Sequence, residues 1–108
     1  MTTAREVIRL VLRSIDTDIE LTKTSLEYAQ AKKMINKDEK RMALASGVDY
    51  IYASEKYDSS IGFYSGMESE CRDRLGALNR RREYYVSLDM QCAEEEALEA
   101  VQEDEENE

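Results

Sequence analysis

The stretch that decides the fold is residues 50–92, YIYASEKYDSSIGFYSGMESECRDRLGALNRRREYYVSLDMQC. One residue in every seven belongs to an unbroken ladder, which consists of Tyr50, Tyr57, Tyr64, Cys71, Leu78, Tyr85 and Cys92. Because seven residues make about two turns of an α-helix, such a ladder lies along one side of a rod. We therefore predict continuous or nearly continuous helix from about residue 38 to residue 92.

A first helix is predicted for residues 4–34. Thr3 and Glu6 have the spacing of a capping box, so this helix should begin at Ala4. Apolar residues then recur at alternating four- and three-residue steps, with Thr22 as the one polar member of the series: Ile8, Leu12, Ile15, Ile19, Leu26 and Ala29. Further apolar surface lies beyond this seam, at Val7, Leu10, Val11 and Leu21. We therefore expect the N-terminal half of the helix to be covered from more than one side.

Two breaks are expected between the helices. Asn36 and Glu39 have the spacing of a second cap, which places a tight turn near Asn36. Residues 58–66 collect weak helix formers, and Ser65 with Glu68 could open another capping box. A kink or turn there is favoured over the alternative that the glycines at 62 and 66 permit a close helix crossing. The expected helices span residues 4–34, 38–58 and 63–98.

The composition supports an all-α fold. Proline is absent, only four glycines are present, and no run alternates in the manner of a strand. The predicted architecture is an elongated three-helix bundle or a helical hairpin, with coiled-coil-like packing. It forms one domain, residues 1–92, followed by an acidic tail.

That tail, residues 93–108, carries the whole charge excess. The net charge is −9. Residues 1–40 hold eight basic and seven acidic side chains, residues 41–92 hold seven and eight, and residues 93–108 hold none and nine. A folded body that imitates a nucleic acid should be acidic over its faces, so only the tail could act in this way. We expect the tail to be partly helical or disordered, because its carboxylates repel one another.

Catalytic equipment is missing from the sequence. Without histidine, the chain lacks the commonest general base and the commonest zinc ligand. Cys71 and Cys92 would lie about 30 Å apart in one helix, too far to form a disulfide within it. No phosphate-binding glycine motif and no apolar run of membrane-spanning length occurs. We expect a cytoplasmic protein that is not an enzyme and holds no cofactor or metal.

Aromatic and basic residues supply two candidate binding surfaces. Tyr50, Tyr57 and Tyr64 would form a stripe that either fills the core or binds a protein. The one concentrated basic patch comprises Arg72, Arg74, Arg80, Arg81 and Arg82, with Tyr84 and Tyr85 beside it. This patch could be solvated or paired with the tail, or it could bind a protein or a nucleic acid.

Acidic residues supply the third candidate surface. Its members in the tail are Glu94, Glu95, Glu96, Glu103, Asp104, Glu105 and Glu106. Near the other end of the chain, Arg5, Arg9 and Arg13 form a basic stripe at four-residue intervals. Because like charges at this spacing repel, we expect an acidic surface opposite them, and the tail of this chain or of a neighbour is a candidate.

These features favour a non-enzymatic helical module for protein–protein interaction that associates with itself, as a homodimer. One alternative is a small acidic inhibitor, of the viral antagonist type, whose tail imitates a nucleic acid and blocks a nucleic-acid-binding protein. A further alternative is nucleic-acid binding through the arginine patch, gated by the tail. No membrane partner is expected.

Overall fold

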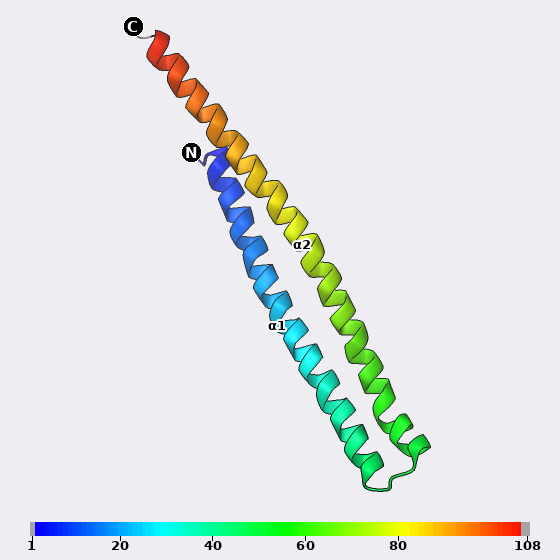
Figure 1. Ribbon diagram of the computed structural model, residues 1–108. Coiled ribbons are helices and arrows are strands. Elements are labelled where there is room, and N and C mark those ends of the chain that lie inside the picture. The colour runs from blue at the N-terminus through cyan, green and yellow to red at the C-terminus, as the bar shows by residue number, and fades with distance from the viewer. Residues whose placement is uncertain (1, 107–108) are drawn as a thin grey trace. The chain divides into compact units, whose positions relative to one another are not determined.

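The computed structural model describes residues 2–106, and these form two helices (Figure 1). Helix α1 spans Ala4–Ala45 and helix α2 spans Tyr50–Glu106. The chain divides into two compact units: unit 1 comprises Met1–Ile19 and Ala77–Glu108, and unit 2 comprises Glu20–Gly76. Both helices contribute to each unit, and each unit is described below by itself.

Helix α1 begins as the capping pattern predicted. The backbone amide of Glu6 donates a hydrogen bond to Oγ1 of Thr3 at 3.2 Å. Thr3 therefore satisfies one of the amides that an α-helix leaves without a partner in its first turn. The expected start at Ala4 is confirmed.

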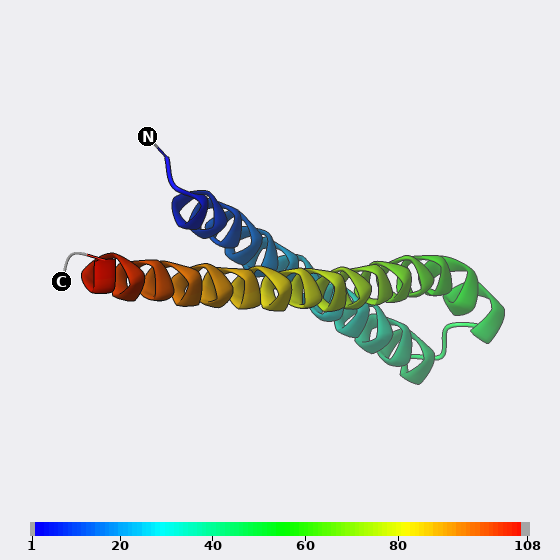
Figure 2. The ribbon, with the colours of Figure 1, turned by 90° about the horizontal axis from the view of Figure 1, so that it is seen from above.

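The turn between the helices lies at residues 46–49 of unit 2, and the prediction of a turn near Asn36 is wrong (Figure 2). Gly47 has a φ of 91°. Its amide donates a hydrogen bond to the carbonyl oxygen of Leu44 at 3.1 Å, and the amide of Val48 donates to the carbonyl oxygen of Ala43 at 3.1 Å. This pair of bonds is a Schellman motif, which requires a left-handed residue that glycine adopts at little cost. Asp49 then caps α2, accepting from the amide of Tyr52 at 3.3 Å.

Asn36 acts within α1 instead of ending it. Its Nδ2 donates to the carbonyl oxygen of Lys32 at 2.9 Å. The seam of α1 also continues through this region, because the four- and three-residue steps after Ala29 lead to Lys33, Asn36 and Lys40, all of which are half-buried. The apolar pattern therefore ends at Ala29 because the next seam positions are polar, whereas the helix itself continues to Ala45.

The turn expected as one possibility in residues 58–66 is not found, because α2 runs through them without interruption. Gly62 and Gly66 are exposed, and a Cβ atom built on either would meet nothing within 4 Å. Neither glycine makes a turn or a close helix crossing. The face formed by Tyr57, Ile61 and Tyr64 is half-buried in unit 2, and its packing outweighs the weak helix propensity of the serines and glycines.

The C-terminal segment is helical as far as Glu106, beyond the expected end near residue 98. Ala97, Leu98 and Ala100 are strong helix formers, and they maintain the helix among the carboxylates. Asn107 and Glu108, the end of the predicted acidic tail, lie outside the described residues. The expectation of an all-helical chain is confirmed, and residues 2–106 form a helical hairpin with one turn, not three helices.

The core of each unit follows the predicted seams, except that Ala53 belongs to neither predicted pattern. In unit 1, the buried apolar residues are Ile8, Ile15, Ile19 and Leu78. In unit 2, the buried residues are Thr22, Ala29 and Ala53. Within the ladder on α2, every member from Tyr57 to Cys92 is buried or half-buried, whereas Tyr50 is exposed because it begins the helix. The two periodic patterns therefore mark the faces on which the helices bury their side chains.

Candidate interaction surfaces

The tyrosine stripe packs largely inside unit 2. The rings of Tyr28 and Tyr64 meet edge to face, with centroids 6.1 Å apart, and Phe63 contacts Tyr64 in the same way at 5.1 Å. The neighbouring Tyr28 hydroxyl and partial desolvation raise the pKa of Tyr64. Tyr50 remains 65% exposed, and Lys40 Nζ lies 5.3 Å from its ring centroid. Of the predicted stripe, only Tyr50 presents most of its surface to solvent.

The arginine patch is divided between the two units and is partly neutralised. In unit 2, Arg72 bonds Glu68 at 2.9 Å, while Arg74 is exposed. In unit 1, Arg82 bonds Asp16 at 2.8 Å, and Arg80 and Arg81 are exposed. Beside them, the rings of Tyr84 and Tyr85 meet edge to face at 5.2 Å. The charge that this patch offers to a nucleic acid is therefore smaller than its five arginines suggest.

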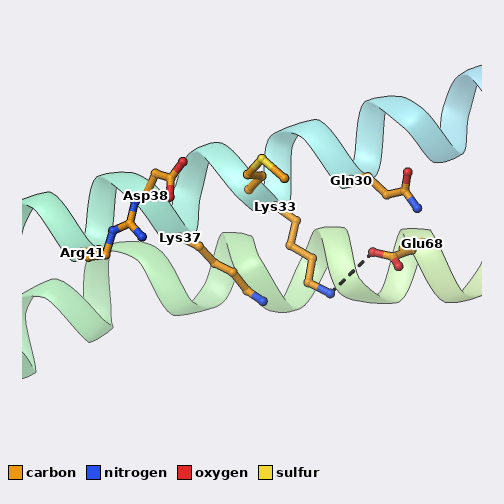
Figure 3. A pocket seen from close by; sticks show the side chains of 7 residues that line it. Gln30, Lys33, Lys37, Asp38, Arg41 and Glu68 are labelled. Atoms are coloured by element: carbon orange, nitrogen blue, oxygen red, sulfur yellow. Dashed lines mark hydrogen bonds and ion pairs between the residues drawn. The ribbon is translucent and has the colours of Figure 1, made fainter.

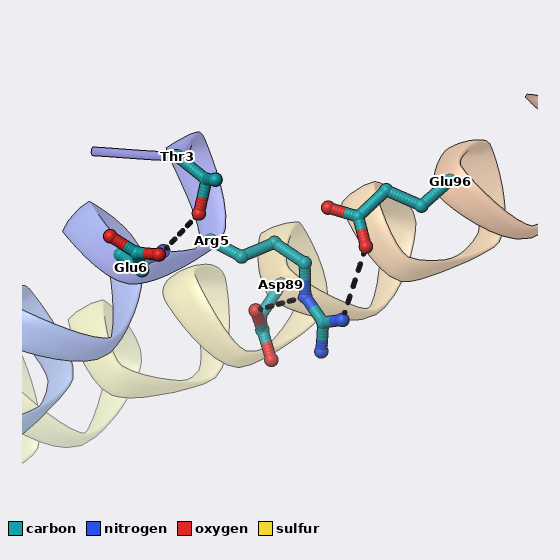
Figure 4. A network of polar contacts seen from close by, with 5 residues as sticks. All are labelled: Thr3, Arg5, Glu6, Asp89 and Glu96. Carbon is teal, nitrogen blue, oxygen red and sulfur yellow. Dashed lines mark hydrogen bonds and ion pairs between the residues drawn. The ribbon is translucent and has the colours of Figure 1, made fainter. Parts of the chain in front are cut away.

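An acidic surface does lie opposite the basic stripe of α1, as expected for Arg5 (Figure 4). In unit 1, the guanidinium of Arg5 bonds Asp89 at 3.1 Å and Glu96 at 3.3 Å. The hydrogen bond from Arg5 holds the pKa of the Asp89 carboxyl below its ordinary value, and the charge of Arg9 adds to this effect. Glu96, a residue of the predicted tail, thus contacts the N-terminal end of the same chain.

The other acidic candidates lie on the last turns of α2. The exposed residues among them are Glu94, Glu95, Glu103 and Asp104. The side chains of Glu105 and Glu106 lie outside the described part of the structure. Leu98 and Val101 lie among these carboxylates and are also exposed. The segment therefore presents both charge and apolar surface to a partner.

Unit 1 also contains an open apolar groove of about 500 Å³. Its lining consists of Ala4, Val7, Ile8, Val11, Tyr85, Leu88 and Cys92. Apart from the phenol of Tyr85 and the thiol of Cys92 its lining is apolar, so it lacks the set of convergent polar groups that orients a small substrate. Its chemistry suits another apolar side chain.

A second groove, in unit 2, is lined by basic, acidic and uncharged residues and has a volume of about 550 Å³ (Figure 3). Its lining consists of Gln30, Lys33, Met34, Lys37, Asp38, Arg41 and Glu68. Lys33 and Lys37 extend from α1 toward α2, where Lys33 Nζ lies 3.5 Å from Glu68. The hydrogen bond from Arg72 and the charge of Lys33 lower the pKa of Glu68. With three cations and two carboxylates, the groove could hold an anionic group.

Sequence reasoning missed an apolar stripe on α1 in unit 2. Leu21, Tyr28, Ile35 and Met42 stand seven residues apart and are 62%, 50%, 49% and 66% exposed. We call these four residues the outer stripe. Its seven-residue interval was visible in the sequence, but the expected end of the helix at residue 34 removed half of its members. The structure places all four on one continuous helix.

Other chemistry is absent from the described part of the chain. Among residues 2–104, whose side chains the structure describes, no group of three or more His, Cys, Asp or Glu could hold a metal ion. In the same range, no helix is long and apolar enough to cross a membrane. Comparison of the chain with protein-family models, with curated proteins and with solved structures finds no match.

Proposed function

We propose that this protein is a non-enzymatic helical module for protein–protein interaction that associates with a second copy of itself. The observation that carries the proposal is the series of large apolar side chains that stay exposed on the two helices. In residues 2–104, no large side chain is less than 2% exposed, whereas the outer stripe and several other large apolar side chains are about half exposed or more. These exposed apolar side chains remain available for burial against a partner.

The energetics support association. Full burial of a Leu, Ile, Met or aromatic side chain contributes about 1.5–3 kcal/mol, so a side chain that is already half-covered can gain roughly half of that. Association costs about 4–15 kcal/mol in lost translational and rotational freedom. One such residue is therefore insufficient. A series of them, contributed by both partners, can exceed the cost, and a stripe along a helix provides such a series.

Sedimentation velocity over a wide range of protein concentrations tests this function. We expect a reversible monomer–dimer equilibrium, with the dimer dominant at ~100 µM, a concentration that corresponds to a modest association free energy. Helicity measured by circular dichroism serves as the control for folding. A chain that stays fully helical and strictly monomeric at ~1 mM would contradict self-association.

A second candidate function is the binding of a basic protein through residues 93–106. An inhibitor that blocks a nucleic-acid-binding protein, the alternative expected from the sequence, would act in this way. The supporting observation is local to unit 1. Because Arg5 contacts Asp89 and Glu96, the residues of α2 that follow Glu96 extend beyond the start of α1 (Figure 1). They expose carboxylates together with Leu98 and Val101. Truncation after Cys92 should abolish capture of a basic partner without affecting self-association; unchanged, salt-independent capture would exclude this function.

A further inference from the structure

The outer stripe has a period that indicates a helical partner. Its members recur every seven residues, or 3.5 per turn, whereas a straight α-helix has 3.6 residues per turn. The stripe therefore drifts by about 20° per seven residues, and a partner follows it only by winding around α1 as a second helix. A flat protein surface would impose no such interval. The partner that fits the outer stripe is thus an α-helix.

About half or more of each stripe residue is open to solvent, although the ring of Tyr28 also contacts Tyr64 of α2 edge to face. At about 100° per residue, the centre of the stripe lies roughly 130° around the helix from the centre of the seam, and Leu21 and Tyr28 lie about 100° from Thr22 and Ala29. Those two seam residues are buried in unit 2, whereas the stripe residues are about half exposed or more. A second helix can therefore cover the exposed part of the stripe while the contact of Tyr28 with Tyr64 is kept.

Small side chains alternate with the large ones along this face. Three residues after each stripe member come Thr24, Ala31, Asp38 and Ala45. The hydroxyl of Thr24 bonds the carbonyl of Glu20 at 3.0 Å, which leaves its methyl group for packing. We call the stripe and these four small residues together the outer face of α1. Its large and small side chains occupy two parallel rows.

Size complementarity selects a second copy in antiparallel orientation. Antiparallel helices bring the large row of one copy against the small row of the other. One register pairs every member: Leu21 with Ala45, Tyr28 with Asp38, and Ile35 with Ala31 of the second copy. Met42 then meets Thr24. In this register the Tyr28 hydroxyl can donate to the Asp38 carboxylate, whose position on the side of α1 away from α2 is visible in Figure 3. A parallel pair would instead oppose Asp38 to Asp38.

Charge complementarity supports the same register. Glu27 and Arg41 flank the outer face on one edge, and the antiparallel register places Glu27 of each copy opposite Arg41 of the other. Arg41 is 78% exposed, and its ion pair with Asp38 at 2.9 Å is local to the helix. On the other edge Lys32 faces its own counterpart, but its ammonium lies 5.8 Å from the Tyr28 ring centroid. Two attractive pairs therefore flank the interface.

We propose that the outer face of α1 in unit 2 binds the same face of a second copy, antiparallel, with Glu27 and Arg41 paired across the interface. This proposal rests on the proposed function and adds the surface and the register. The proposed function concerns only whether the chain associates, so the two can fail separately.

Charge reversal at the two edge residues tests the register. Glu27→Arg and Arg41→Glu each replace two attractive pairs by two repulsive ones, and each variant alone should dimerise about tenfold more weakly. A mixture of the two variants restores both attractions, so heterodimers should form at least as tightly as the wild-type dimer. The double variant should also recover wild-type affinity. The matched control is Glu70→Arg, an exposed carboxylate of α2 in the same unit.

Apolar disruption tests the face. Ile35→Glu should weaken the dimer by at least about 100-fold while helicity is kept, since Ile35 is 49% exposed in the monomer. Its control is Ile51→Glu, which alters a 66% exposed residue of α2. If a dimer forms and neither Ile35→Glu nor the charge reversals weaken it, the proposed face is wrong, whereas the proposed self-association is retained. If Val7→Glu in the unit 1 groove disrupts it instead, that groove is the interface. A helical chain that never dimerises overturns both proposals.

Discussion

Replacement of Gly62 and Gly66 by alanine tests whether α2 is continuous where the sequence predicts a break. Both glycines lie in the helix interior, and an added Cβ atom meets no other atom within 4 Å at either position. Alanine should therefore stabilise the protein by about 0.5–1 kcal/mol at each position, because it lowers the conformational entropy of the unfolded chain without a clash. The double variant should gain about 1–2 kcal/mol.

Urea denaturation followed by circular dichroism measures this gain, at one fixed protein concentration because association shifts apparent stability. A gain of about 1 kcal/mol should raise Tm by about 4–8 °C for a domain of roughly this size. If the segment were a turn that needs glycine, each alanine would cost stability. Destabilisation by either substitution would refute the continuous helix.

Three further predictions follow from the turn, the polar contacts and the core. Gly47→Ala should destabilise the fold by about 1–2 kcal/mol, because its φ of 91° is strained for any residue with a Cβ atom; an unchanged urea midpoint would contradict the Schellman turn. The pKa values of Glu68 and Asp89 are lowered, so their contributions are complete above the ordinary carboxyl pKa of about 4 and disappear as the pH falls through the lowered values. Tm measured from pH 7 to pH 2 should therefore fall on acidification, less steeply in Asp89→Asn, and equal slopes would exclude a role for the Arg5 contact. Ile15→Ala should lower the free energy of unfolding by about 3 kcal/mol, because Ile15 is 2% exposed. Leu21→Ala, measured at a concentration where the chain is monomeric, should lower it by less than about 1 kcal/mol. Equal losses in the two variants would contradict the assignment of buried and exposed faces.

The seams could be predicted from the sequence because their apolar members follow the helical period. Ile8, Ile15 and Ile19 are buried as that period requires, and the ladder on α2 marks its packed face. The turn could not be predicted with the same ease. It depends on one left-handed glycine and the Asp49 cap. The sequence pattern at Asn36 is a more familiar signal for a helix end, but in the structure Asn36 bonds the helix backbone at Lys32 and the helix continues.

The candidate surfaces were predicted less well, because exposure depends on tertiary packing. Tyr57 and Tyr64 were expected on a possible binding stripe, and they are half-buried in unit 2. Arg72 and Arg82 carry ion pairs that composition does not reveal. The contact of Arg5 with Glu96 was foreseeable, because a run of like charges requires compensation. The outer stripe became visible only when α1 proved to continue through Ile35 to Met42.

Disulfide trapping tests the central claim most directly. Leu21→Cys and Ala45→Cys, introduced together with Cys71→Ser and Cys92→Ser, place two thiols 24 residues apart on one helix, about 36 Å from each other. They cannot bridge within a chain, but the antiparallel register brings each next to its counterpart in the second copy. We predict that mild oxidation yields a covalent dimer with two disulfides, whereas Leu21→Cys alone in the same background yields none. A chain that remains monomeric on a non-reducing gel, or a dimer that forms through Leu21→Cys alone, would contradict the account.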